Sequence, residues 1–188
     1  MSRPRSDEKR SAILEAAVRV LIREGLGAPT AGIAKEAGVA NGSLFTYFET
    51  KADLFNQLYL ELKGEMAAAA MKGLGEDAAL REQFFLLWSN WMRWAVRAPG
   101  KRRALALLSV SEELTPASRT AGHQTMAGIA ALMERCRANG PMRDAPFAFV
   151  ATIMNALAEA TMDFVVHDPT SADEHCKAGF DALWRMLN

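Results

Sequence analysis

The feature that most constrains the fold is a 22-residue stretch at positions 30–51, TAGIAKEAGVANGSLFTYFETK. Its first half places small apolar residues at the spacing of one face of a short helix. Gly38 follows where a helix ends in a left-handed residue, a conformation that glycine adopts without steric cost. Leu44 and Phe48, four positions apart, give a second short helix its inward face. The spacing therefore predicts a helix-turn-helix.

The second of these helices has a polar outward face. Asn41, Ser43 and Thr46 are not needed for packing, and their side chains can hydrogen-bond base edges or phosphates. The amide of Asn41 has the geometry that suits adenine, and Gly42 lets the backbone approach DNA closely. The pattern predicts a recognition helix for double-stranded DNA, and a plain solvated surface is the alternative.

Further motifs carry a resemblance: ILEAA at 13–17, a glycine at 25, IAKEAGV at 33–39, GSLFTYF at 42–48 and KADL at 51–54. On these motifs the block from Arg10 to Leu54 resembles the TetR family of bacterial repressors. Other segments are similar to its RamR-type, multidrug-sensing branch: RPRS at 3–6, LFNQLYL at 54–60, SVSEEL at 109–114 and ALAEATMDF at 156–164. The resemblance implies a ligand-responsive repressor that binds an inverted-repeat operator as a homodimer.

The resemblance also implies phosphate contacts from Thr30, Tyr47 and Lys51. This chain departs from the family where Phe45 replaces a common tyrosine and where Ala40 occupies a position that is often polar. The complete set of predicted DNA contacts is Thr30, Ala40, Asn41, Gly42, Ser43, Thr46, Tyr47 and Lys51.

Helix-start and helix-stop signals divide the chain into helices, and no segment has the pattern of a strand. Besides the two short helices, we expect helices at about 7–24, 51–70, 78–98, 102–113, 116–133, 146–166 and 171–187. The predicted fold is all-α. It has an N-terminal three-helix helix-turn-helix domain at 1–50 and a six-helix ligand-binding and dimerisation domain at 51–188. Thr50 and Asp53 have the spacing of a capping box, so the fourth helix follows the motif without a linker.

The segment from 84 to 94 carries five aromatic residues, more than one buried stripe of a helix accommodates. Two interpretations remain open: an apolar pocket with methionines as adaptable walls, or plain core. Tyr59 and Trp88 match aromatic pocket positions of the similar branch, and Met154 stands where that branch can carry a phenylalanine. The predicted ligand is a small hydrophobic or aromatic cationic molecule. The predicted ligand-binding residues are Tyr59, Leu62, Met66, Phe85, Trp88, Met92 and Met154.

The last two predicted helices combine small residues, which let helices approach closely, with large apolar residues that fill the seam. We expect a twofold dimer through a four-helix bundle, made of residues 146–166 and 171–187 of each chain. The predicted interface residues are Asn155, Ala156, Phe180, Leu183 and Trp184. Glu159 and Asp163 share one helix face, which either lines a site for a cationic ligand or meets solvent or the partner chain.

Charge and composition limit the partners. The 188 residues have a formal net charge of zero, and residues 1–51 carry +2 from eight basic and six acidic side chains. DNA affinity must therefore come from placed contacts and dimer avidity rather than from bulk charge. Charged residues interrupt every apolar stretch, which predicts no membrane span, and no secretory signal is evident. Cys136 and Cys176 fit free thiols in a reducing cytoplasm, so a cytoplasmic protein is expected.

The sequence has no evident nucleophile elbow, phosphate loop or Ser/His/Asp arrangement, so we expect no catalytic site and no enzyme. His167 and His175 bracket a proline break rather than share a face, and neither a metal nor a cofactor is predicted. The alternative is a helical small-molecule-binding module or enzyme with a non-functional helix-turn-helix, and the polar outward face argues against it. Arg3 and Arg5 belong either to an arm that touches DNA or to a solvated terminus.

Overall fold

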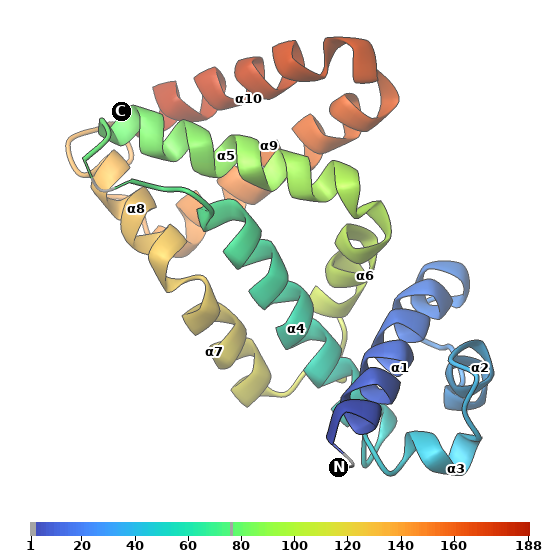
Figure 1. Cartoon of the computed structure of the whole chain (residues 1–188). Coiled ribbons are helices and arrows are strands. Elements are labelled where there is room, and N and C mark those ends of the chain that lie inside the picture. Colours follow the sequence, from blue (N-terminus) through green and yellow to red (C-terminus); the bar gives the residue numbers. More distant parts are fainter. Residues whose placement is uncertain (1–2, 76) are drawn as a thin grey trace. The chain divides into compact units, whose positions relative to one another are not determined.

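The computed structural model describes residues 3–75 and 77–188, with side chains from Ser6 onward. Within these residues the chain is all helical, which confirms the predicted fold class (Figure 1). Its elements are α1 (Arg3–Glu24), α2 (Thr30–Glu36), α3 (Asn41–Leu44), α4 (Lys51–Met71), α5 (Leu80–Arg97), α6 (Pro99–Ser109), α7 (Pro116–Thr125), α8 (Ala127–Arg137), α9 (Phe147–His167), the 3₁₀ turn η1 (Pro169–Ser171) and α10 (Ala172–Leu187).

The chain divides into two compact units. The first unit contains Met1–Gly64 and Pro99–Gln124, so α6 and α7 belong with the helix-turn-helix rather than with the later helices. The second unit contains Glu65–Ala98 and Thr125–Asn188. Helix α4 continues from one unit into the other, and the division falls after Gly64 in its middle.

The first unit is built on α1. The apolar side chains of Ile13, Val20 and Leu21 on this helix are fully buried. Leu44 and Phe48, the predicted inward face of the second short helix, are also 0% exposed. They give α1 and the helix-turn-helix one shared core, which keeps the polar residues of α3 on a fixed support.

Helix α1 begins at Arg3, four residues before the predicted start. A proline is tolerated in the first turn of a helix, where its missing N–H has no intrahelical acceptor. Pro4 therefore does not delay the helix, and Ser6, which the prediction placed at its boundary, lies inside it. The side chains of Arg3 and Arg5, on which the DNA-arm hypothesis depends, lie outside the described residues.

Two boundaries in the middle of the chain differ from the prediction. The helix expected to begin at about 102 begins at Pro99, again because proline suits the first helical position. The single helix expected at 116–133 is broken at Met126, where φ is −91° and ψ is 5°. The described residues therefore contain ten α-helices rather than the nine predicted.

The second unit packs α5 against α9 and α10 through an aromatic core. The ring of Phe180 lies 6.1 Å from that of Phe84 and stacks on Trp184 at the same distance. Gly179 permits the close approach of α10, because a Cβ there would clash with the hydroxyl of Thr161 and come within 3.1 Å of the Trp88 ring. Phe180 and Leu183 therefore belong to the core of a single chain, whereas Ala156, Ala160 and Phe164 on α9 are exposed.

Helix α9 is the most apolar helix described, although Glu159 and Asp163 interrupt it. It is 21 residues long and apolar enough to cross a membrane by length and composition alone. Only a third of its most apolar window is buried in the chain, and a core helix of a globular protein meets the same criteria. Its buried face includes Val150, Ala158 and Met162, while Phe149 and Phe164 are 55% and 64% exposed.

Candidate nucleic-acid interface

The turn between α2 and α3 has the predicted backbone conformation. Gly38 has a φ of 68°, and its N–H donates to the carbonyl of Lys35 at 3.1 Å. The N–H of Val39 closes the turn by donating to Ala34 at 3.0 Å. A Cβ added at Gly38 would meet nothing within 4 Å, so the positive φ is what requires glycine at this position.

Helix α3 is a single regular turn that continues as hydrogen-bonded turns. Ala40 precedes it in an extended conformation, and the N–H groups of Tyr47 and Phe48 both donate to the carbonyl of Leu44, at 3.0 and 3.1 Å. The hydroxyl of Thr46 donates to the carbonyl of Ser43. Because its proton is used there, Thr46 can meet a nucleic acid only as a hydrogen-bond acceptor.

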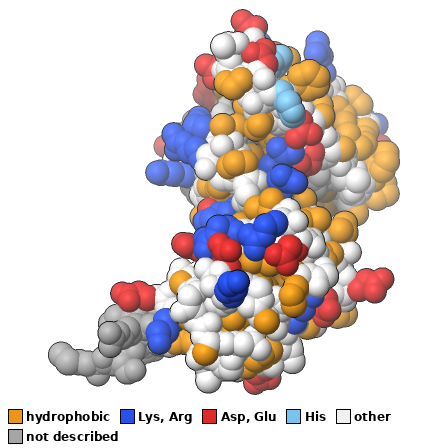
Figure 2. Space-filling view, turned by 90° about the vertical axis from the view of Figure 1, so that its right-hand side faces the viewer, with side chains coloured by type: hydrophobic (Ala, Val, Ile, Leu, Met, Phe, Trp, Pro, Cys, Tyr) orange, Lys and Arg blue, Asp and Glu red, His pale blue; other side chains and the backbone are white. Residues whose placement is uncertain are grey.

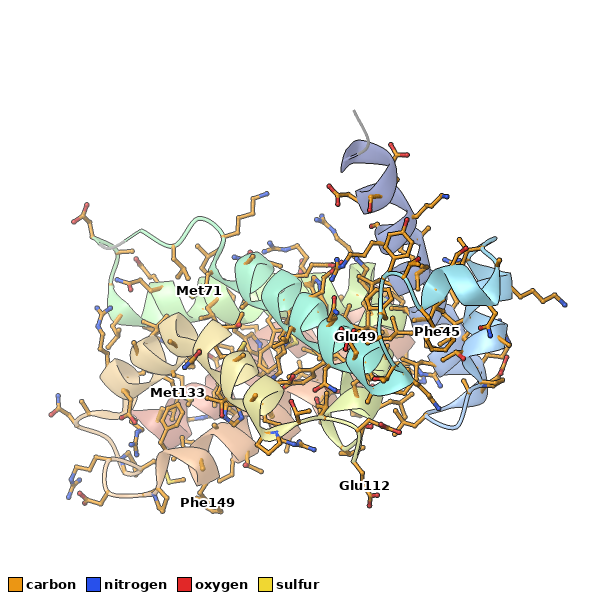
Figure 3. All side chains as sticks on the ribbon, turned by 90° about the horizontal axis from the view of Figure 1, so that it is seen from below. Phe45, Glu49, Met71, Glu112, Met133 and Phe149 are labelled. Carbon is orange, nitrogen blue, oxygen red and sulfur yellow. The ribbon has the colours of Figure 1, made fainter. Side chains whose placement is uncertain are left out.

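The predicted recognition face is exposed. Five of the predicted DNA contacts are exposed, namely Ala40, Asn41, Gly42, Ser43 and Thr46. The other three, Thr30, Tyr47 and Lys51, are half-buried. Phe45 shares this surface at 42% exposure (Figure 3). This large apolar side chain lies beside the three small polar side chains of Asn41, Ser43 and Thr46, so the surface offers both hydrogen-bonding groups and a hydrophobic contact.

Lys51 has a structural role that the sequence did not reveal. Its ammonium group donates to the carbonyl of Leu26 at 2.7 Å and lies 5.2 Å from the centre of the Phe55 ring. An ammonium group carries three donors, so this bond leaves capacity for an external acceptor. Lys51 thus joins the start of α4 to the loop after α1.

The start of α4 is capped as predicted. The N–H of Asp53 donates to the hydroxyl of Thr50 at 3.0 Å, and the carboxylate of Asp53 accepts from the N–H of Glu49 at the same distance. The bond to Thr50 is the first half of a capping box, and the carboxylate of Asp53 reaches one residue beyond Thr50 to close the turn at Glu49. This arrangement confirms that α4 follows the helix-turn-helix directly.

A second cluster fixes α2 on α1. Glu36 accepts from Arg19 at 2.8 Å and lies 3.5 Å from Arg23, and the hydrogen bond from Arg19 is the main cause of the lowered pKa of this carboxyl. The two arginines lie four residues apart on α1, a spacing that places them on one face. Sequence reasoning missed this cluster because its acid comes from a different helix.

Asn56 was also missed, and it is among the few buried polar residues described. Its amide nitrogen donates to the carbonyls of Ala52, at 2.6 Å, and Glu113, at 2.7 Å. Its amide oxygen accepts from the N–H of Thr115 at 2.9 Å and from the hydroxyl of Thr115 at 3.3 Å. The side chain joins α4 to the segment before α7 within the first unit.

Charge is not segregated on the face that Figure 2 shows, where basic and acidic side chains are interleaved. This agrees with the small excess of +2 on residues 1–51. A surface of this kind gives little nonspecific attraction to DNA, because that attraction grows with the number of phosphates neutralised.

Six of the seven predicted ligand-binding residues are buried. Tyr59, Leu62 and Met66 lie three and four positions apart on α4, so they share one face of that helix. Trp88 is 0% exposed, and Met92 and Met154 are 3% and 4% exposed. The residue that is not buried is Phe85, at 39% exposure.

Two of the buried aromatic residues have specific partners. The indole N–H of Trp88 donates to the carbonyl of Cys176 at 2.9 Å. Burial raises the pKa of the Tyr59 phenol, and Gly122 on α7 leaves room for this ring. Each contact fits a packed core within its own unit, so a ligand at either residue must displace the groups that now surround it.

The predicted dimer residues fall into two groups. Asn155 and Ala156 are exposed on α9 and Trp184 is half-buried, whereas Phe180 and Leu183 are 1% and 0% exposed within their own chain. Phe149 lies near the start of α9, and its side chain points outward (Figure 3).

The glycine turn, the buried support of α3 and its exposed polar face define a helix-turn-helix DNA-binding protein of the transcription-regulator class. Residues 13–58 match the model of the bacterial regulatory proteins of the TetR family. A TetR-family transcription regulator from Shewanella sp. PV-4 is 30% identical, with a TM-score of 0.84 over 94% of this chain and 96% of that chain. The chain belongs to the TetR family, as the sequence motifs predicted.

Two further comparisons extend this result. A TetR-family regulator from Marinobacter aquaeolei VT8 has the same fold, with 24% identity and a TM-score of 0.86 over 98% of both chains. The "Fatty acid metabolism regulator protein" of Bacillus subtilis is 33% identical over 79 residues, which are 42% of this chain and 41% of that protein. The chain thus matches about two fifths of the length of this curated relative.

Proposed function

We propose that the chain is a dimeric repressor that acts in the cytoplasm and leaves its operator when a hydrophobic small molecule binds. The observation that carries the proposal is the exposed polar surface of α3, which Leu44 anchors in the core at 0% exposure. In this proposal residues 1–50 bind DNA, and residues 51–188 hold the effector and form the dimer. Relatives of the family are transcription regulators and not enzymes, which disfavours the enzymatic alternative.

In the proposed complex α3 lies in the major groove of an inverted repeat. Asn41 reads a base through its amide, and Tyr47 and Lys51 contact the flanking phosphates. Thr46 acts as an acceptor for an amino group of a base, because its hydroxyl proton is already donated. Two copies of α3 in one dimer read successive half-sites one helical turn apart.

The exposed face of α9 supports a homodimer. Phe149 and Phe164 are more than half exposed, while Ala156 and Ala160 are exposed small residues between them. Small residues let two helices approach closely, and large ones at each end fill the remaining space. A second copy of the chain covers this apolar face in a bundle of α9 and α10 from both chains.

The effector we propose binds within the second unit, among Trp88, Met92 and Met154 and the α4 residue Met66. Methionine side chains adapt to ligands of different shapes. A flat aromatic molecule, as in the RamR-type branch, is one candidate. Displaced side chains tilt α4, a continuous helix whose capping box follows the DNA-binding motif directly, and so change the spacing of the two recognition helices.

A fatty acyl compound is the second candidate effector. The name of the Bacillus subtilis relative describes a regulator of fatty acid metabolism. In addition, the predicted ligand-binding residues of this chain include no carboxylate that could pair with a cation. A long apolar chain needs only the apolar walls that methionine and leucine provide.

The test combines DNA binding with each candidate effector. Fluorescence anisotropy on inverted-repeat DNA from upstream of the neighbouring gene should show one dimer per site. Decanoyl-coenzyme A or rhodamine 6G is then added to the protein–DNA complex, and the true effector class should release the DNA. Trp88→Phe should weaken that release. Binding of DNA by a monomer would contradict the proposal. A release of DNA that neither Trp88→Phe nor Met154→Ala weakens would also contradict it.

A further inference from the structure

The second unit contains a groove that the proposed effector site does not use. It has a volume of about 560 Å³ and lies along the last turns of α4 and the second half of α5. Its polar lining consists of Glu65, Lys72, Asn90, Arg93, Trp94 and Arg97. None of these residues belongs to the predicted DNA contacts or to the predicted ligand-binding residues.

The groove is electropositive in a chain without net charge. Lys72, Arg93 and Arg97 oppose the single carboxylate of Glu65, which leaves the lining with a net charge of +2. Within residues 3–75 and 77–188, neither Lys72 nor Arg97 forms a salt bridge. Like charges along a concave wall create a local potential that attracts anions.

Hydrogen bonds hold the groove in shape. Asn90 is 8% exposed, and its amide nitrogen donates to the carbonyls of Ala70, at 3.2 Å, and Lys72, at 2.8 Å. Its amide oxygen accepts from the guanidinium of Arg93 at 2.7 Å. Arg93 is therefore held by a buried residue that also caps the end of α4, and its remaining N–H groups are available to a ligand.

The carboxylate in the groove is also held in place. The indole N–H of Trp94 donates to Glu65 at 3.1 Å, and the ring itself is 7% exposed. Cations at helix ends commonly offset the helix dipole, which accounts for Arg97 in the last turn of α5 and for Lys72 just beyond α4. The dipole does not account for Arg93, which lies before the last turn and is fixed by Asn90.

We infer that this groove binds a small phosphorylated molecule carrying at least two negative charges. Guanidinium groups contact phosphate through paired N–H donors, and the lysine supplies a further point charge. The volume lies in the range of small-molecule sites. The groove is a second ligand site of the regulator, separate from the proposed effector site.

The test is isothermal titration of the full-length protein, without DNA, with inorganic pyrophosphate and with adenosine diphosphate. Both should bind at one site per chain. The double variant Lys72→Gln/Arg97→Gln should weaken binding at least tenfold. Glu65→Gln keeps an oxygen for the Trp94 bond and raises the lining charge, so it should tighten binding about threefold.

The matched control is Arg185→Gln, which removes an exposed cation of α10 that is not part of the groove. It should change the affinity for pyrophosphate less than twofold. An equal loss in Arg185→Gln and the double variant would reveal nonspecific charge attraction and overturn the inference. Absence of heat at millimolar pyrophosphate, from protein with an unchanged circular dichroism spectrum, would also overturn it.

Discussion

The amide oxygen of Asn56 on α4 accepts two hydrogen bonds from Thr115, which lies 59 residues later at the start of α7. One comes from the backbone N–H at 2.9 Å and the other from the hydroxyl at 3.3 Å. With the two carbonyls that its nitrogen reaches, the side chain is fully hydrogen-bonded although it is only 8% exposed.

Replacing Asn56 by alanine should lower the free energy of unfolding by about 2–3 kcal/mol, because the N–H of Thr115 and two carbonyls lose their partner in a buried site. Urea denaturation at fixed protein concentration measures the change. Asn139→Ala, at an exposed position, is the control and should cost less than about 0.5 kcal/mol. Equal effects of both variants would mean that the network does not stabilise the first unit.

Two glycines should respond in opposite directions to alanine. At Gly122 a Cβ would lie 2.6 Å from Cε1 of Tyr59, so Gly122→Ala should destabilise the protein by about 1–3 kcal/mol. At Gly64, inside α4, the added Cβ meets nothing within 4 Å, so Gly64→Ala should stabilise it by up to about 1 kcal/mol. Thermal unfolding of the two variants provides the comparison, and a lower Tm for Gly64→Ala would show that α4 must bend there.

Alkaline pH should destabilise the fold through Cys136. Burial raises the pKa of this thiol to about 11, whereas the unfolded chain loses the same proton near about pH 8.5. The stabilisation is complete below about pH 8.5 and is lost as pH rises towards 11. Tm measured between pH 8 and 10.5 should fall less steeply in Cys136→Ala than in the wild type. Parallel curves would show that the thiol does not contribute.

Mutations should distinguish the residues that read DNA bases from those that contact the phosphates. Asn41→Ala should relax preference at particular base pairs by about 1–3 kcal/mol, because only a side chain that reads a base edge discriminates between bases. Tyr47→Phe removes a proposed phosphate contact and should weaken all sequences alike. Binding to a panel of single-substituted operators distinguishes the two, and identical profiles would show that α3 is not the recognition helix.

The local parts of the fold were predictable from the sequence. Gly38 and the capping box from Thr50 to Asp53 act through neighbours within five residues, so their spacing alone specified the turn and the start of α4. The break at Met126 carries no glycine or proline and was missed. The start of α6 at Pro99 was also missed, although proline suits the first helical position.

The site was harder to predict where it depends on distant residues. The bonds of Asn56 and the cluster around Glu36 join different helices, and no local pattern reports such pairs. The aromatic residues near Trp88 were ambiguous for another reason. A pocket wall and a core have the same composition, and the two differ only in which groups a ligand can displace.

The first unit is made of two separate segments of the chain, and this limits how its parts can be exchanged with those of another regulator. Exchanging residues 1–64 alone would transplant the first part of α4 without α6 and α7, and Asn56 would face a foreign segment in place of Glu113 and Thr115. A functional chimera with new DNA specificity therefore requires two insertions, at 1–64 and at 99–124, or a recognition helix grafted residue by residue onto α3. A single genetic crossover after α4 would therefore join α4 to α6 and α7 helices from a different protein.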